Sequence, residues 1–177
     1  MTRYRYTRTA RILHWLAALL IVAGFGLGLY MSDLEISPDK LRYYLWHKWL
    51  GITVFMFAGA RLAWRAAHPA PALPQTMPAW QVRAAGAAHG LLYTLMLVIP
   101  VSGWIYSSAT GVSVTYLNLV DLPNLVPKDR ELAGTLLLVH QSLNYLLATV
   151  VTVHVAAALW HHFVDRDDIL ARMLPGR

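Results

Sequence analysis

Residues 132–163 read LAGTLLLVHQSLNYLLATVVTVHVAAALWHHF, an apolar run that exceeds the roughly 20 residues needed to cross a bilayer core. His140 and His154 stand 14 residues apart in this run. At about 100° per residue they return to within about 40° of one helix face, roughly 21 Å apart along the axis. His161 extends the same stripe by seven residues. Because ionisable groups inside a membrane are costly, each such histidine is a functional candidate. The run therefore predicts a membrane helix with ligand-type side chains at two depths.

Working outward, the sequence contains four apolar stretches. They span about Ile12–Met31, Tyr44–Trp64, Ala84–Tyr106 and Leu132–Phe163. Backbone groups in lipid must be hydrogen-bonded internally, so the stretches are predicted to be helices. Only 14% of the 177 residues are charged, against roughly 25% in soluble domains. We therefore predict an all-α membrane protein whose residues 1–177 form a single domain, a bundle of four transmembrane helices.

The charges predict the orientation of the bundle. Ten arginines lie on one side of the predicted spans, and five lysines and arginines, offset by six acidic residues, lie on the other. The positive-inside rule then puts both termini of this multi-pass membrane protein in the cytoplasm. The ten arginines on the cytoplasmic side are Arg3, Arg5, Arg8, Arg11, Arg61, Arg65, Arg83, Arg166, Arg172 and Arg177. For the first apolar stretch, a cleaved signal peptide is the alternative interpretation. The net charge of +6 is thus explained by a lipid bilayer rather than by nucleic acid.

The histidines are the strong metal ligands of this chain. It has eight of them and no cysteine, which excludes disulfides, thiolate zinc sites, iron–sulfur clusters and covalently attached c-type haem. When the 14-residue step is applied to every helix, the side chains fall into two layers. The cytoplasmic layer is predicted to hold His14, Arg61, His89 and His154, and the periplasmic layer Gly28, His47, Gly103 and His140.

This pattern suits a b-type cytochrome with two haems, in which the long fourth helix gives one ligand to each haem. His47 and His140 pair by elimination in the periplasmic layer. In the cytoplasmic layer, His14 and His89 compete to face His154, and the spacing alone does not choose between them. Glycine opposite a ligand leaves room for a porphyrin, and Arg61 is placed to meet a haem propionate. His161 is predicted to contact either lipid headgroups or a quinone or propionate.

Six short motifs occur in order along the chain. They are RILHW at 11–15, HKWLG at 47–51, HGLLY at 89–93, PVSGW at 100–104, HVAAALWHH at 154–162 and RMLP at 172–175, with Arg61 and Arg65 before a proline-rich linker. Taken together, these motifs resemble the bacterial cytochrome b561 family over essentially the whole chain. The resemblance implies a four-helix, di-haem, quinone-linked electron carrier of the inner membrane.

The resemblance also implies the ligand pairs. His14 and His154 would hold the cytoplasmic haem b, and His47 and His140 the periplasmic haem b, whereas His89 matches a family histidine that is not a ligand. Some family members oxidise superoxide at the periplasmic face and reduce ubiquinone.

A periplasmic cluster of Lys40, Arg42 and Lys48 would steer such a small anion toward His47, although Asp33, Glu35 and Asp39 lie close in sequence. Ubiquinone would bind at the cytoplasmic side near His14 and His161.

Two functions fit these features. The first is a self-contained oxidoreductase that passes electrons from a small periplasmic donor, with superoxide as the leading candidate, to ubiquinone. The second is a haem-b membrane-anchor subunit of a hydrogenase-like or formate-dehydrogenase-like complex, in which a redox partner chain would be bound. A homodimer is compatible with both. A haem-free transporter or scaffold is a third interpretation, and haem bands in the purified protein would eliminate it.

Overall fold

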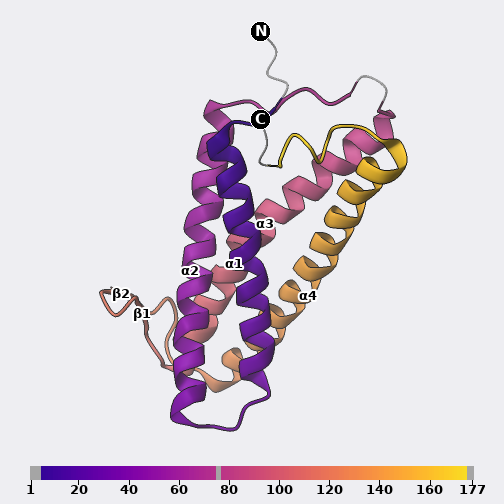
Figure 1. The fold of residues 1–177 in the computed structure, drawn as a ribbon. Coiled ribbons are helices and arrows are strands. Elements are labelled where there is room, and N and C mark those ends of the chain that lie inside the picture. The colour runs from indigo at the N-terminus through magenta and orange to yellow at the C-terminus, as the bar shows by residue number, and fades with distance from the viewer. Residues whose placement is uncertain (1–4, 75–76, 175–177) are drawn as a thin grey trace.

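The computed structural model describes residues 5–74 and 77–174, and within these ranges the chain forms four long helices (Figure 1). They are α1 (Arg8–Ser32), α2 (Pro38–Ala67), α3 (Ala79–Thr110) and α4 (Arg130–Trp160), and α4 continues into a π-helical turn, η1 (His161–Asp165). Each predicted apolar stretch lies within one of these helices, and the last runs into η1. Arg3, Arg177 and Pro175, which entered the predictions above, lie outside the described residues.

Local capping fixes where the helices begin and end. The Thr7 hydroxyl accepts the Ala10 N–H, the Ser37 hydroxyl accepts the Lys40 N–H, and the Asp129 carboxylate accepts the N–H groups of Glu131 and Leu132. These side chains satisfy donors that a helix N-terminus leaves unpaired. Gly111 ends α3 in the left-handed conformation, with φ of 80°, which glycine adopts without a steric penalty.

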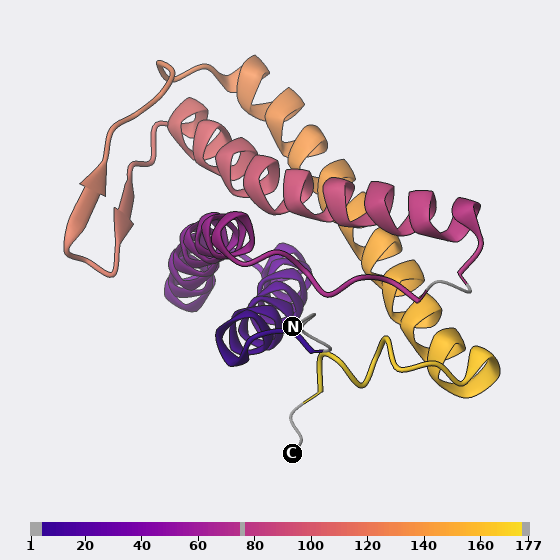
Figure 2. The same cartoon turned by 90° about the horizontal axis from the view of Figure 1, so that it is seen from above.

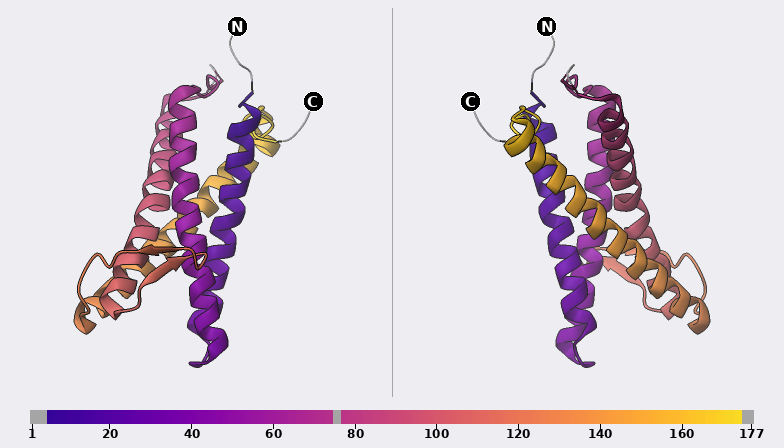
Figure 3. Two further views of the ribbon diagram at one scale, coloured as in Figure 1. Left: turned by 90° about the vertical axis from the view of Figure 1, so that its left-hand side faces the viewer. Right: turned by 90° about the vertical axis from the view of Figure 1, so that its right-hand side faces the viewer.

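The helices pack in chain order, α1 on α2, α2 on α3 and α3 on α4. Seen from above, α1 and α2 are viewed nearly end-on, while α3 and α4 run obliquely past them (Figure 2). The side views show the α1–α2 pair diverging from α4 toward one end of the molecule (Figure 3). The start of α1 and the end of η1 lie at the same end of the molecule, the upper end in Figure 1, with α1 on the left and η1 on the right.

The segment after η1 bridges α4 back to α1. The Arg11 guanidinium donates to the Leu174 carbonyl (2.8 Å), and the Trp15 indole donates to the Met173 carbonyl (2.9 Å). Arg172 is buried and pairs with Asp168 (2.8 Å). Its guanidinium also donates to the Ala72 carbonyl in the linker between α2 and α3. This tail therefore closes one end of the bundle, where α1 and α4 would otherwise be separate.

The core lies at mid-height of the bundle. Val54, Met96 and Leu147 are buried, and Ile21 packs against both of the buried clusters to which they belong. Each of these residues lies seven positions from a predicted layer on its own helix, for example Leu147 between His140 and His154. Since seven residues rise about 10.5 Å, an apolar layer separates the two histidine layers.

The outer surface is apolar. Leu19, Val22, Leu138 and Val153 each expose more than 60% of their surface. Within the described residues, α1, α3 and the segment Arg130–Asp165 are long and apolar enough to cross a membrane. The predicted helical membrane class is therefore confirmed. Helix α2 runs beside α1 but carries more charged residues, so its role as a fourth span stays a prediction.

A small hairpin between α3 and α4 was not predicted. Strands β1 (Val114–Tyr116) and β2 (Val120–Leu122) pair antiparallel around Leu117 and Asn118, both of which have positive φ. The hairpin lies against α2, where the Trp49 indole donates to the Thr115 carbonyl (2.8 Å). This turn is difficult to predict from the sequence, because a leucine rarely adopts positive φ.

Candidate haem-binding site

His47 of α2 and His140 of α4 face each other at the end of the bundle predicted to be periplasmic. Their ring centres are 6.1 Å apart and their planes are inclined by 85°. The two residues are 93 positions apart in the chain, so only the packing of the helices brings them together. The predicted pair is thus placed within reach of one shared ligand.

The partners of Nδ1 orient both rings. His47 Nδ1 donates to the Gly24 carbonyl (3.1 Å). His140 Nδ1 lies 2.9 Å from the Ser102 hydroxyl, whose own proton is donated to the Ile99 carbonyl (2.7 Å). The hydroxyl must therefore accept from His140. Both rings carry a proton on Nδ1, which leaves Nε2 free for a metal.

Two glycines make room for these rings, which lie where larger side chains would otherwise stand. A Cβ atom on Gly28 would lie 3.1 Å from Cε1 of His47, and one on Gly103 would lie 3.0 Å from Cε1 of His140. Gly51 faces open space one turn beyond His47. These glycines and both histidines line a cavity of about 320 Å³, a volume within the range of small-molecule and cofactor sites.

The ring spacing fits a single iron. Two iron–nitrogen bonds of about 2.0 Å, together with about 1.1 Å from each nitrogen to its ring centre, place two axial imidazoles roughly 6 Å apart. His47 and His140 match this spacing, and so do His14 and His154, at 6.3 Å. The donor set therefore fits bis-histidine haem ligation in the periplasmic layer, and the cytoplasmic pair His14 and His154 has the matching ring spacing.

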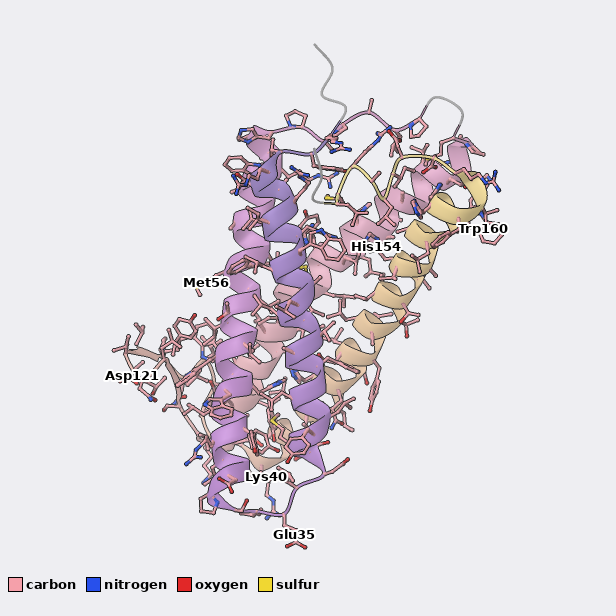
Figure 4. The ribbon with its side chains drawn as sticks, in the orientation of Figure 1. Glu35, Lys40, Met56, Asp121, His154 and Trp160 are labelled. Carbon is pink, nitrogen blue, oxygen red and sulfur yellow. The ribbon has the colours of Figure 1, made fainter. Side chains whose placement is uncertain are left out.

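The cytoplasmic layer gathers three histidines. His154 lies on the inner side of α4 in the half of the molecule that holds the tail (Figure 4). Its ring centre is 6.3 Å from that of His14 and 5.3 Å from that of His89. His89 Nδ1 donates to the Ala85 carbonyl one turn earlier (2.7 Å). Both competitors predicted for this layer thus lie next to His154, and the spacing of His14 is the closer to that of two axial ligands.

Arg61 lies in the same layer, as predicted. Its guanidinium donates to His14 Nδ1 (3.1 Å) and lies over the Tyr93 ring, 5.2 Å from the ring centre. A fixed cation therefore stands beside the predicted ligand pair.

His161 is held by acidic residues that the sequence reasoning did not single out. Its Nδ1 lies 2.7 Å from Oδ2 of Asp167 and 3.2 Å from Oδ2 of Asp165. The signal was present in the sequence, where His161 is followed by VDRDD at 164–168, but spacing on a regular helix does not bring residue 167 onto the face of residue 161.

The three predicted steering cations have different surroundings. The Lys40 ammonium donates to the carbonyls of Ser32 (3.5 Å) and Leu34 (2.5 Å) at the end of the bundle opposite His154 (Figure 4). Arg42 pairs with Asp39 at 3.7 Å. Lys48 lines the cavity beside His47. The structure thus brings only Lys48 to the cavity, and it gives the other two local partners.

Comparison with known proteins matches this architecture to a family. Residues 5–176 match the model of prokaryotic cytochrome b561. Cytochrome b561 homolog 2 of Escherichia coli K12 is 33% identical, over 98% of this chain and 93% of the relative. The chain belongs to the prokaryotic cytochrome b561 family. Cytochrome b561 homolog 1 of the same organism is 27% identical, over 98% of both chains. A probable superoxide oxidase CybB of Yersinia pestis is 27% identical, over 92% of both chains.

Membership of the cytochrome b561 family confirms the resemblance found in the motifs. The family consists of helical membrane cytochromes that bind haem b and transfer electrons, so this cytochrome is a membrane-bound haem protein. Ser102 and the Gly24 carbonyl, which orient the periplasmic rings, were not predicted. Ser102 precedes Gly103 in the PVSGW motif, and that position was the available signal.

The contact between Gly103 and the His140 ring gives a direct test of the periplasmic site. Gly103→Val is expected to displace His140, because even a Cβ atom at this position meets the ring. The amount of haem bound per chain should then fall. Gly86→Val is a matched control on the same helix, since nothing lies within 4 Å of a Cβ atom there. Haem quantification by pyridine haemochromogen would measure both variants, and an equal loss in the two would contradict the role of Gly103.

Proposed function

We propose that this cytochrome binds two haems b and transfers electrons across the bacterial inner membrane, from superoxide at the periplasmic face to ubiquinone at the cytoplasmic side. The observation that supports this most directly is the presence of two facing histidine pairs at the spacing of axial ligands. His47 and His140 would hold the periplasmic haem, and His14 and His154 the cytoplasmic haem. Bound haem b supplies a one-electron redox centre in each layer.

The proposed topology has four spans and cytoplasmic termini. Helix α2 would be the fourth span, since it is 30 residues long and packs along α1. Its charged residues lie mainly toward its two ends, where lysine and arginine side chains can extend to the membrane surface. The start of α1 and the end of η1 lie at one end of the molecule, as an even number of spans requires.

Haem binding in the cytoplasmic layer requires a local change at Arg61. A neutral imidazole that binds iron through Nε2 carries its proton on Nδ1, and such a ring cannot accept from Arg61. In the structure Arg61 donates to that nitrogen of His14. The guanidinium must therefore release His14, and it is then free to pair with a haem propionate.

The overall reaction balances without a further reactant. Two superoxide ions give up one electron each and leave as two molecules of dioxygen. One ubiquinone takes the two electrons and two protons and becomes ubiquinol. The name of the Yersinia pestis relative supports superoxide as the donor. Lys48 at the periplasmic cavity supports an anionic donor.

The cytoplasmic end carries the proposed quinone contacts. His161 continues the His140–His154 stripe, and the tail that follows η1 reaches α1 at Arg11 and Trp15, on either side of His14. An imidazole at this position can donate a hydrogen bond to a quinone carbonyl.

Stopped-flow mixing of the oxidised, purified cytochrome with superoxide tests this function. We expect haem reduction within the mixing experiment, followed by reoxidation when a soluble ubiquinone is added. Haems that stay oxidised would exclude superoxide as the donor. A second redox chain that co-purifies and is required for reduction would instead support the membrane-anchor function.

Lys48 is expected to carry most of the steering. Lys48→Gln should slow haem reduction by superoxide about tenfold at low salt and flatten its salt dependence, because steering of small anions depends on charges at the cavity mouth. Neutralising Lys40 and Arg42 as well should add little, since neither lines the cavity and Arg42 pairs with Asp39. Arg42→Gln is the matched control. If Arg42→Gln slows the reaction as much as Lys48→Gln, the cavity charge is not the cause.

A further inference from the structure

The turn that ends α4 has an unusual geometry. Residues 161–165 form a π-helical turn, and the Asp167 N–H donates to the His161 carbonyl (3.1 Å). Arg166, between them, has a φ of 54°. Non-glycine residues in this conformation cost free energy and are concentrated at functional sites. The turn brings Asp165 and Asp167 onto one side of His161, which a continuous α-helix would not do.

The Asp167 carboxylate is held by a backbone hydrogen bond that does not involve the His161 ring. Its Oδ1 accepts the Ile169 N–H (3.0 Å), while its Oδ2 lies 2.7 Å from His161 Nδ1. The orientation of the carboxylate is therefore set by the tail rather than by the imidazole.

The orientation of the His161 ring leaves Nε2 as the nitrogen that can contact another group. Because Nδ1 is directed at the two carboxylates, Nε2 is the nitrogen that can meet another group. The His161 side chain is 16% exposed, Asp167 is 21% exposed and Asp165 is 36% exposed. Asp165 is thus the most exposed of the three side chains, and the imidazole beside it is mostly buried.

We propose that Asp167 is a positioning residue that holds His161 with its proton on Nδ1 and directs Nε2 toward the reduced quinone, and that Asp165 connects this pair to cytoplasmic water. The inference rests on the proposed quinone reduction. For each ubiquinone reduced, two electrons arrive from the redox centres and two protons come from water. In its doubly protonated form the His161 ring donates the Nε2 proton to a quinone oxygen and keeps the proton on Nδ1. Nε2 is then protonated again from the aqueous side before the second transfer. The carboxylate charge of Asp167 compensates the positive charge of the ring while the ring holds both protons.

The kinetic test uses the intact cytochrome with its haems, reduced by dithionite and mixed with a soluble ubiquinone in the presence of EDTA, because these side chains can also bind a divalent cation. Asp167→Asn keeps the shape and removes the charge. We expect reoxidation to slow about tenfold or more, the usual effect of losing an orienting partner, with a larger solvent deuterium isotope effect and unchanged haem spectra. Asp165→Asn should have a smaller effect.

Asp168→Asn is the matched control, because it removes the neighbouring carboxylate, which pairs with Arg172 and is not one of the two carboxylates beside His161 Nδ1. Equal slowing in Asp167→Asn and Asp168→Asn would overturn the proposal in favour of a structural role. Normal kinetics in Asp167→Asn, with slow kinetics in His161→Ala, would also overturn it while leaving the proposed function intact. A wild-type protein that does not reduce quinone at all would reject the proposed function instead.

A second readout does not depend on turnover. In the dithionite-reduced protein labelled with ¹⁵N-histidine, the signal that His161→Ala removes identifies this ring. We expect the wild-type ring to carry its proton on Nδ1, and Asp167→Asn to lose this single tautomer. An unchanged tautomer in Asp167→Asn would contradict the positioning role.

Discussion

Replacing His140 with alanine is expected to remove the proposed periplasmic haem and leave the cytoplasmic one, so that the haem-to-protein ratio falls from two to one. The ring centre of His140 lies 6.1 Å from that of His47, and both rings line one cavity and pack against Gly28 and Gly103. Among the described residues, no third histidine is predicted at this depth, so nothing replaces the lost ligand. Haem quantification and a reduced-minus-oxidised spectrum measure the result.

His47→Ala should give the same ratio and the same residual spectrum, because each haem requires both axial imidazoles. Ser102→Ala is the graded control. It removes the hydroxyl that accepts from His140 Nδ1 but leaves the ligand in place, so the haem should be retained with weaker binding. Two haems per chain in either His140→Ala or His47→Ala would contradict the assignment of this pair.

The histidine layers could be predicted from sequence because helical geometry is regular over long distances. The 14-residue step places His140 and His154 on one face without any knowledge of the neighbouring helices. The same step predicted Gly28 and Gly103 in the layer of His47 and His140, and the structure places one glycine against each of these rings. A membrane helix cannot change its backbone hydrogen bonding freely, which makes this arithmetic dependable.

Contacts that depend on irregular backbone could not be predicted in this way. The π-helical turn at 161–165 shifts the face on which Asp167 lies. The positive φ at position 166 is not predictable, because the residue there is an arginine rather than a glycine. The hairpin turn at Leu117 and Asn118 is hidden for the same reason. Lys40 shows a different limit, since its carbonyl partners come from the loop conformation rather than from a charged partner in the sequence.

The competition between His14 and His89 is the point at which spacing in the sequence was insufficient. Both rings lie against His154, because α1 and α3 reach the same depth from different sides. The 6.3 Å separation of His14 from His154 matches two axial ligands, and the 5.3 Å separation of His89 leaves less room for an iron between the rings. The family resemblance and the ring spacing thus favour the same ligand.

His154→Ala is therefore expected to remove the cytoplasmic haem, because His154 belongs to both alternative pairs. His14→Ala should remove the same haem, and His89→Ala should retain two haems per chain. His68→Ala is the matched control. Its ring stacks on Trp64 at the end of α2, with ring centres 4.0 Å apart, away from both layers. Haem quantification and redox spectra on the four purified variants measure these outcomes.

Loss of a haem in His89→Ala, with two haems retained in His14→Ala, would reverse the assignment. Two haems in both of these variants would show that either ring can serve as the ligand, which the difference of 1.0 Å between the two ring separations argues against.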